Sequence, residues 1–101
     1  MEVIWTKQAV HSVNNFVDYI AQDNYQAAAA WAHSFFKRTD QLIAQPRSGR
    51  IVPEYNEPDL REIIEGNYRI IYRIREAENT VFIQAVLNAR QDPPKSSKKF
   101  R

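Results

Sequence analysis

Three arginines stand on one side of a stretch that has the pattern of a β-strand. In residues 67–75, NYRIIYRIR, every second residue is apolar or aromatic, and Arg69, Ile71, Arg73 and Arg75 lie between them. Side chains of a strand point alternately to its two faces. The stretch therefore predicts one apolar face and one face that carries three guanidinium groups around Ile71.

Guanidinium groups bind the paired oxygens of carboxylates and phosphates, which leaves two interpretations open. The arginines can pair with acids on neighbouring strands, such as Glu62 or Glu76. This is the favoured interpretation for Arg75, which lies near a turn. For Arg69 and Arg73, together with Ile71, we favour a surface that faces an acidic, partly apolar partner segment.

Other groups that could carry chemistry are few. His11 and His33 fall within predicted helices and are expected on helix surfaces, away from any catalytic centre. The chain has no cysteine and no cluster with the spacing of a metal site. No metal and no cofactor are therefore expected.

The elements that must position these residues form one α+β domain in the order β-α-α-β-β-β. A strand is predicted at 2–6, a helix at 7–22 capped by Thr6, and a second helix over 25–45 that Pro46 ends. With almost no linker between them, the helices predict an antiparallel hairpin. Residues 46–59 are expected to form a surface loop. Strands at 60–65, 68–75 and 80–88 follow, with the hairpin packed on a small, mainly antiparallel sheet.

Apolar residues decide two further features of this layout. The stretch 80–88 is apolar on both faces, which predicts a central strand. The large aromatic side chains are expected to fill the layer between hairpin and sheet. They are Trp5, Phe16, Trp31, Phe35, Tyr68 and Tyr72.

Charge divides the chain into a body and a basic tail. Residues 1–92 contain ten lysines and arginines against twelve acids, whereas 93–101, PPKSSKKFR, contain four bases and no acid. The tail is interpreted as a solvated end, with contact to nucleic acid or an acidic partner as the alternative. No apolar run reaches the ~18–20 residues of a membrane span, and the first residues lack the features of a signal peptide. A soluble, cytoplasmic protein is expected.

The order of several short motifs resembles the RelE/ParE superfamily of type II toxins from toxin–antitoxin modules, closest to its ParE-like arm. The similarity extends over residues 2–92 and leaves the basic tail outside. The matching pieces are Pro46 with Gly49-Arg50, Val52-Pro53-Glu54, Leu60-Arg61-Glu62, Tyr68–Arg73, and Val86 with Arg90.

The resemblance implies one of two activities. RelE-like members are ribosome-dependent endoribonucleases that cut mRNA, and ParE-like members act on DNA gyrase. In the nuclease case Arg69, Arg90 and Arg61 would be the catalytic cations and Glu54 the base. Glu54 is, however, expected to be a structural partner of Arg50 or Arg61.

The residues for proton transfer favour the second activity. Asn88 stands where many relatives have a histidine, and an asparagine does not exchange a proton near pH 7. The leading hypothesis is therefore a toxin that binds DNA gyrase without catalysing a reaction itself. The alternatives are a nuclease that acts on the ribosome and mRNA, and a degenerate member that acts only as a co-repressor. The resemblance further implies a cognate antitoxin, promoter DNA contact only through the antitoxin complex, and no membrane partner.

Overall fold

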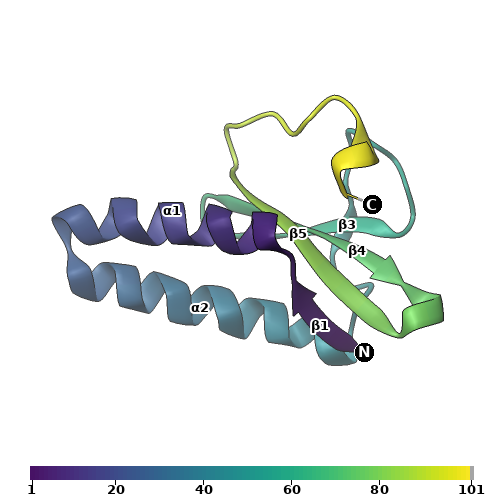
Figure 1. Cartoon of the computed structure of the whole chain (residues 1–101), viewed down its shortest axis with the longest axis horizontal. Coiled ribbons are helices and arrows are strands. Elements are labelled where there is room, and N and C mark those ends of the chain that lie inside the picture. The colour runs from purple at the N-terminus through teal and green to yellow at the C-terminus, as the bar shows by residue number, and fades with distance from the viewer. Residues whose placement is uncertain (101) are drawn as a thin grey trace.

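The computed structural model describes residues 1–100 as a helical hairpin packed against one face of a five-stranded sheet (Figure 1). The strand order is β1-β5-β4-β3-β2. The elements are β1 (Glu2–Trp5), α1 (Lys7–Asp23), α2 (Tyr25–Ala44), β2 (Arg50–Ile51), β3 (Leu60–Glu65), β4 (Tyr68–Arg75) and β5 (Thr80–Asn88), with short 3₁₀ turns at Glu76–Glu78 and Ser97–Phe100. The predicted α+β class and hairpin-on-sheet arrangement are confirmed.

Two side-chain caps set where the helices begin. The backbone N–H of Ala9 donates to Thr6 Oγ1 (3.2 Å), and that of Ala27 donates to Asn24 Oδ1 (3.0 Å). Asn24 is at once the last cap of α1 and the first cap of α2. A single residue therefore separates the helices, which run antiparallel as a hairpin that projects beyond the sheet (Figure 1).

The sheet is mostly antiparallel, as predicted, with one parallel pair. β4 pairs antiparallel with both β3 and β5, whereas β1 pairs parallel with β5. β5 is therefore central. The register between β4 and β5 shifts between Ile71 and Tyr72, where Gln84 is the extra residue. One prediction is incomplete, because the loop 46–59 contains the two-residue strand β2, paired with β3. Two residues are too few for periodicity to reveal.

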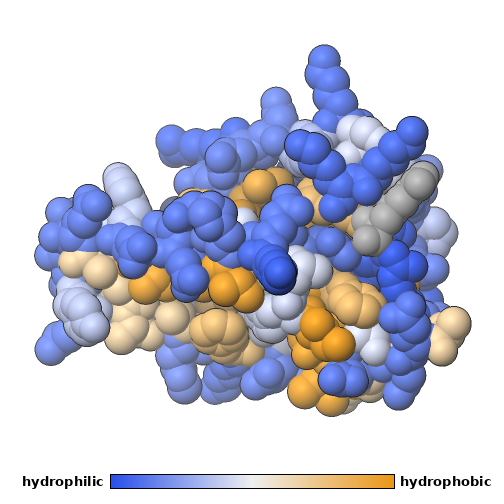
Figure 2. Space-filling model, in the orientation of Figure 1, coloured by the Kyte–Doolittle hydropathy of each residue, from blue (hydrophilic) through white to orange (hydrophobic). Residues whose placement is uncertain are grey.

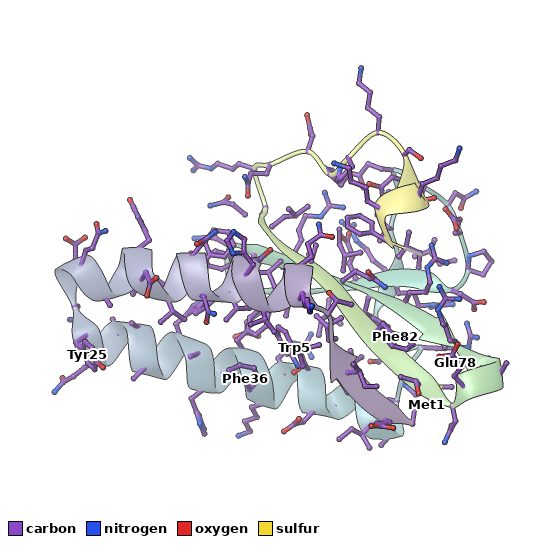
Figure 3. The ribbon with its side chains drawn as sticks, in the orientation of Figure 1. Met1, Trp5, Tyr25, Phe36, Glu78 and Phe82 are labelled. Atoms are coloured by element: carbon purple, nitrogen blue, oxygen red, sulfur yellow. The ribbon has the colours of Figure 1, made fainter. Side chains whose placement is uncertain are left out.

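The main core lies between the hairpin and the sheet. Val13, Phe35 and Leu42 from the helices pack on Ile70, Tyr72 and other buried residues of the strands. The predicted aromatic residues all belong to this layer, and all of them except Tyr72 form a connected series of ring contacts. At its edge the Trp5 ring lies 5.1 Å from that of Phe36 on α2 (Figure 3). The predicted aromatic layer is confirmed.

A second, smaller core covers the opposite face of the sheet, which we call the far face. Its centre is a cluster of buried residues into which the C-terminal segment folds back: Val52, Leu60, Ile71, Ala85 and Phe100. Figure 1 shows the end of the chain returning over β3 and β4. Phe100 is fully buried, and Pro93 is buried as well. The interpretation of 93–101 as a solvated end is therefore wrong for Pro93 and Phe100, whereas Lys95, Ser96, Lys98 and Lys99 are exposed, and residue 101 lies outside the described part.

The surface is predominantly hydrophilic, with apolar side chains gathered along the hairpin and near the N-terminus in the view of Figure 2. Three large apolar residues of β1 and α2 are at least a third exposed: Ile4, Phe36 and Ile43. Within residues 1–100, no helix is both long and apolar enough to cross a membrane.

Candidate functional site

The most strongly connected polar site is an ion network on the far face, around Arg69 of β4. Arg69 Nε donates to Glu62 Oε1 (2.6 Å), and its two terminal nitrogens donate to the two oxygens of Glu54 (2.7 and 2.9 Å). Arg69 is only 6% exposed. Three of its five N–H donors are therefore used by carboxylates inside the protein.

Glu62 of β3 joins a second arginine to this network. Its side chain is fully buried, and Arg50 Nε of β2 donates to Glu62 Oε2 (2.7 Å), while Arg50 Nη2 lies 2.6 Å from the same oxygen in an ion pair. Arg50 and Glu62 are direct partners across the β2–β3 pair. Two arginines and two glutamates therefore balance one another, as buried charges must. The short strand β2, which periodicity missed, positions one member.

The network determines how Glu54 can behave chemically. Hydrogen bonds from Arg69 lower the pKa of Glu54 below its ordinary value, and burial opposes this effect only partly. The same contacts raise the pKa of Arg69. Glu54 is therefore an ionised carboxylate held by a cation, which makes it a weak proton acceptor near pH 7. Sequence analysis predicted a structural pairing for Glu54, but the partner is Arg69, not Arg50 or Arg61.

Arg61 is placed elsewhere, on the helix side of the sheet, opposite Tyr72 in the β3–β4 register. Its guanidinium donates to the carbonyl oxygens of Pro58 (2.9 Å) and Gly49 (3.0 Å). Tyr72 Oη donates to the Pro46 carbonyl (2.7 Å) and accepts from the Gly49 N–H (3.0 Å). Arg61 and Tyr72 thus pin the loop that precedes β2, a structural role.

The pinned loop also explains why a glycine stands at position 49. A Cβ atom there would lie 2.5 Å from the Glu62 carbonyl oxygen and 2.6 Å from Tyr72 Oη. The first of these is a backbone atom, so relief would need the strands to move. The close approach of the loop to β3 therefore requires glycine at this position.

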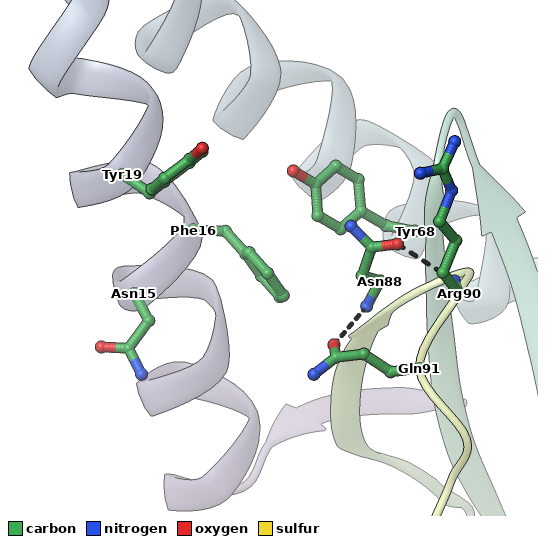
Figure 4. A pocket seen from close by; sticks show the side chains of 7 residues that line it. All are labelled: Asn15, Phe16, Tyr19, Tyr68, Asn88, Arg90 and Gln91. Atoms are coloured by element: carbon green, nitrogen blue, oxygen red, sulfur yellow. Dashed lines mark hydrogen bonds between the residues drawn. The ribbon is translucent and has the colours of Figure 1, made fainter.

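Arg90 lies in a third place, in the turn that follows β5. It lines a pocket with Phe16 of α1 and with Tyr68 and Asn88, at one end of the sheet (Figure 4). Tyr68 belongs to the helix side, whereas Arg69 points to the far face. Of the four candidate catalytic residues, the structure therefore brings only Arg69 and Glu54 together.

The predicted partner-binding residues are covered in this structure. Ile71 is fully buried beneath the C-terminal segment, and Arg73 Nε donates to the Phe100 carbonyl. Arg73 also donates to Glu57 (3.4 Å). Tyr55 secures the same segment by donating to the Pro94 carbonyl and by a ring contact with Phe100 (6.1 Å). Sequence analysis treated the tail as detached from this face, whereas residues up to Phe100 cover it, so a partner at this face would have to displace them.

The remaining predictions concern groups away from these sites. Both His11 and His33 are exposed on the helices, as expected. Arg75, for which pairing with an acid was favoured, makes no ion pair with residues 1–100, and Glu76 pairs with Arg47 instead (3.0 Å). A group of three or more residues able to hold a metal ion is absent from the described part of the chain. Sequence analysis missed Tyr55 and Phe100 and expected Glu54, not Glu62, as the partner of Arg50. A lone aromatic residue in a basic tail could have indicated an anchor.

The fold is similar to those of several toxins of known structure. The chain superposes on the chromosomal ParDE system of P. aeruginosa with a TM-score of 0.71 at 16% identity, covering 87% of this chain and 95% of the other. The RelBE2 toxin–antitoxin complex of Mycobacterium tuberculosis gives 0.58 at 24% identity, with 86% and 88% covered. The isolated E. coli RelE toxin gives 0.64 at 15% identity, with 90% and 86% covered. At these identities the likeness shows the fold alone.

Sequence-family comparison supplies the assignment. Among curated proteins, none matches this chain in sequence. A family model does match, over residues 3–93, and it describes the ParE toxin of the type II toxin–antitoxin system parDE. The match begins within β1, includes both helices and all other strands, and ends where the C-terminal segment begins. The chain belongs to the ParE toxin family of type II toxin–antitoxin systems.

Proposed function

We propose that this toxin arrests growth in the cytoplasm by binding and inhibiting DNA gyrase, and that a cognate antitoxin neutralises it. Family membership supports the toxin role. The observation that carries the choice of target is the state of Arg69, whose guanidinium is buried and bound by two carboxylates. According to this proposal, the toxin inhibits gyrase by binding to its surface and catalyses no reaction itself.

The Arg69 network speaks against RNA cleavage on electrostatic grounds. Cleavage at a 2′-hydroxyl needs a base, an acid and a cation that stabilises the charge developing on the phosphate. Glu54 and Glu62 neutralise the cation that would do this, and Arg69 in turn lowers the pKa of the candidate base. Asn88 stands in the position expected for an acid–base residue, and its side-chain oxygen accepts a hydrogen bond from the Arg90 backbone N–H (3.0 Å). Both carboxylates that contact Arg69 in the described residues are thus engaged as its ion-pair partners, which argues against acid–base catalysis there.

The gyrase proposal is tested with purified gyrase and relaxed plasmid. Increasing amounts of the toxin are expected to inhibit supercoiling or to trap linear DNA, and the antitoxin is expected to reverse the effect. A Gly49→Val variant serves as a matched misfolded control, because its side chain has no room beside the Glu62 carbonyl. Supercoiling that stays unaffected at a large molar excess of folded toxin would reject the proposal.

The alternative is a RelE-like ribosome-dependent mRNA endoribonuclease. One observation favours it: a terminal nitrogen of Arg69 lies 2.7 Å from a carboxylate oxygen of Glu54. A catalytic cation and a base could pair in this way before substrate binds. Programmed ribosomes with mRNA provide the test, with cleavage expected to fall by about 10²-fold or more in Arg69→Ala. If the toxin leaves mRNA on ribosomes uncut but inhibits gyrase, the leading proposal is favoured over the nuclease.

For the antitoxin we propose the far face around Ile71, Arg69 and Arg73. The ParDE and RelBE2 neighbours are both toxin–antitoxin systems by description. The C-terminal segment supports this choice, because Phe100 in its 3₁₀ turn packs on Ile71 as an apolar anchor. An antitoxin segment at this face must displace the C-terminal segment, which the structure describes as far as Phe100. Promoter DNA would then be contacted only through the antitoxin complex.

Deletion of residues 93–101 tests the competition. If the tail occupies the antitoxin site, the shortened toxin binds antitoxin more tightly than the full chain in a calorimetric titration. Weaker antitoxin binding, together with weaker gyrase inhibition, would instead mean that the tail itself contacts the partners. Affinity and toxicity that both stay unchanged would show that the antitoxin binds away from the tail.

A further inference from the structure

A pocket of about 500 Å³ lies between α1 and the end of the sheet, and it is separate from the Arg69 network (Figure 4). Asn15, Phe16 and Tyr19 of α1 form one wall. The opposite wall comes from Tyr68 at the start of β4 and from the turn that follows β5. This volume is in the range of small-molecule sites, about 300–1,000 Å³.

One part of the pocket is aromatic. The Phe16 and Tyr68 rings meet edge to face with centroids 4.8 Å apart, and Trp31 supports Tyr68 from behind at 5.0 Å. Tyr19 projects from α1 at the rim and is 69% exposed. Supported rings beside an exposed tyrosine offer a surface on which a flat ligand group can stack.

The polar part of the pocket presents hydrogen-bond donors. Asn88 Oδ1 accepts from the Arg90 backbone N–H (3.0 Å), and Gln91 Oε1 accepts from the Asn88 backbone N–H (2.8 Å), as the dashed lines in Figure 4 show. A backbone N–H can only donate, so these contacts fix which way each amide faces. The NH₂ groups of Asn88 and Gln91 are left to donate to a ligand.

Arg90 adds a positive charge that the protein does not neutralise. The Arg90 guanidinium makes no ion pair with any of residues 1–100, in contrast to Arg69, and none of the residues that line the pocket is acidic. Five N–H donors of Arg90 are thus added to the two amide NH₂ groups. A ligand that satisfies this site must be rich in acceptors and negatively charged.

We propose that this pocket binds a nucleoside phosphate, with the base against Phe16 and Tyr68 and the phosphate on Arg90 and the amides of Asn88 and Gln91. Each half of such a ligand matches one half of the pocket. A single nucleotide suits the site better than a strand, since α1 and the turn after β5 bound it on two sides. The binding requires no cleavage and does not depend on gyrase or the ribosome as target.

The test is a calorimetric titration of the full chain with AMP, GMP, adenosine and inorganic phosphate. AMP or GMP is expected to bind about 10–100-fold more tightly than adenosine or phosphate, since the charge-assisted bonds and the stacking act together. Arg90→Gln is expected to lower AMP affinity to that of adenosine and to leave adenosine binding unchanged. Arg75→Gln, at the other end of β4, is the matched control and leaves both unchanged.

A second readout locates the site. Amide resonances of Phe16, Tyr68 and residues 88–91 are expected to shift on addition of AMP. No binding at millimolar AMP, an affinity that Arg90→Gln does not change, or shifts confined to other residues would each overturn the proposal. Binding of a five-nucleotide single-stranded RNA or an acidic peptide, without binding of AMP, would likewise overturn it and assign the pocket to a polymer. Because gyrase is absent from this test, its failure leaves the gyrase proposal standing.

Discussion

The two faces of the sheet are closed in different ways. The helix side is closed by the hairpin, through a continuous layer of aliphatic and aromatic side chains. The far face is closed by an ion network around Arg69 and by a C-terminal segment anchored by Phe100. The helix side therefore holds the larger apolar core, and the far face is where we propose that the antitoxin binds.

The largest expected effect is on the helix side. Phe35 is fully buried and contacts the rings of Trp5 and Trp31, so Phe35→Ala should lower the free energy of unfolding by about 3–5 kcal/mol. Urea denaturation followed by circular dichroism measures this. The neighbouring Phe36→Ala is the control with a much smaller loss, because Phe36 is 46% exposed. Equal losses at both positions would contradict the comparison.

Next in size is the buried carboxylate of the far face. Glu62→Gln removes the charge that holds Arg50 and Arg69, and should cost about 1.5–3 kcal/mol as lost hydrogen bonds between charged groups. Glu54→Gln should cost less than ~1 kcal/mol, because that side chain is 40% exposed and water can replace it. If Glu54→Gln lowered the free energy of unfolding more than Glu62→Gln does, the exposed Glu54 would contribute more to the stability of the network than the buried Glu62, contrary to this prediction.

Phe100→Ala is expected to lower the free energy of unfolding less than Glu62→Gln does. It should also loosen the C-terminal segment locally. Phe100 buries its ring in the far-face slot, which is worth at most about 1.5–3 kcal/mol. Because the segment can detach without unfolding the sheet, most of the loss should appear as faster hydrogen exchange of amides in residues 93–100. Unchanged exchange there would show that Tyr55 and Arg73 hold the segment without the anchor.

The smallest effect is a pH dependence from Glu54. The pKa of Glu54 is lower in the folded state than its ordinary value of 4.5, so its contribution is fully present above that value. The contribution is lost as the pH falls below about 4.5 and through the folded pKa, where the folded carboxylate also takes up a proton. The difference in unfolding free energy between wild type and Glu54→Gln should therefore shrink between pH 7 and pH 3. A difference that grows with falling pH would contradict the Arg69–Glu54 pairing.

Residue patterns predicted the regular elements closely because those patterns arise from the elements themselves. The strand at 68–75 alternates, the helices carry caps at Thr6 and Asn24, and both faces of 80–88 are apolar. These signals are local in the chain. The two-residue strand β2 carried no such signal, and its existence depends on pairing with β3.

Sequence by itself thus determined the fold class, the order of elements, which strand face carries the arginines, and the resemblance to the toxin superfamily. Only the tertiary structure decided what each arginine does. Arg69 is neutralised by Glu54 and Glu62, Arg61 pins a loop, and Arg90 keeps its charge in a pocket. The physical reason is that these contacts join residues remote in the chain: the Arg69–Glu54 ion pair spans 15 positions, and the hydrogen bond from Arg73 to the Phe100 carbonyl spans 27. Periodicity reports which face a side chain takes, and only the folded chain places the partner that meets it there.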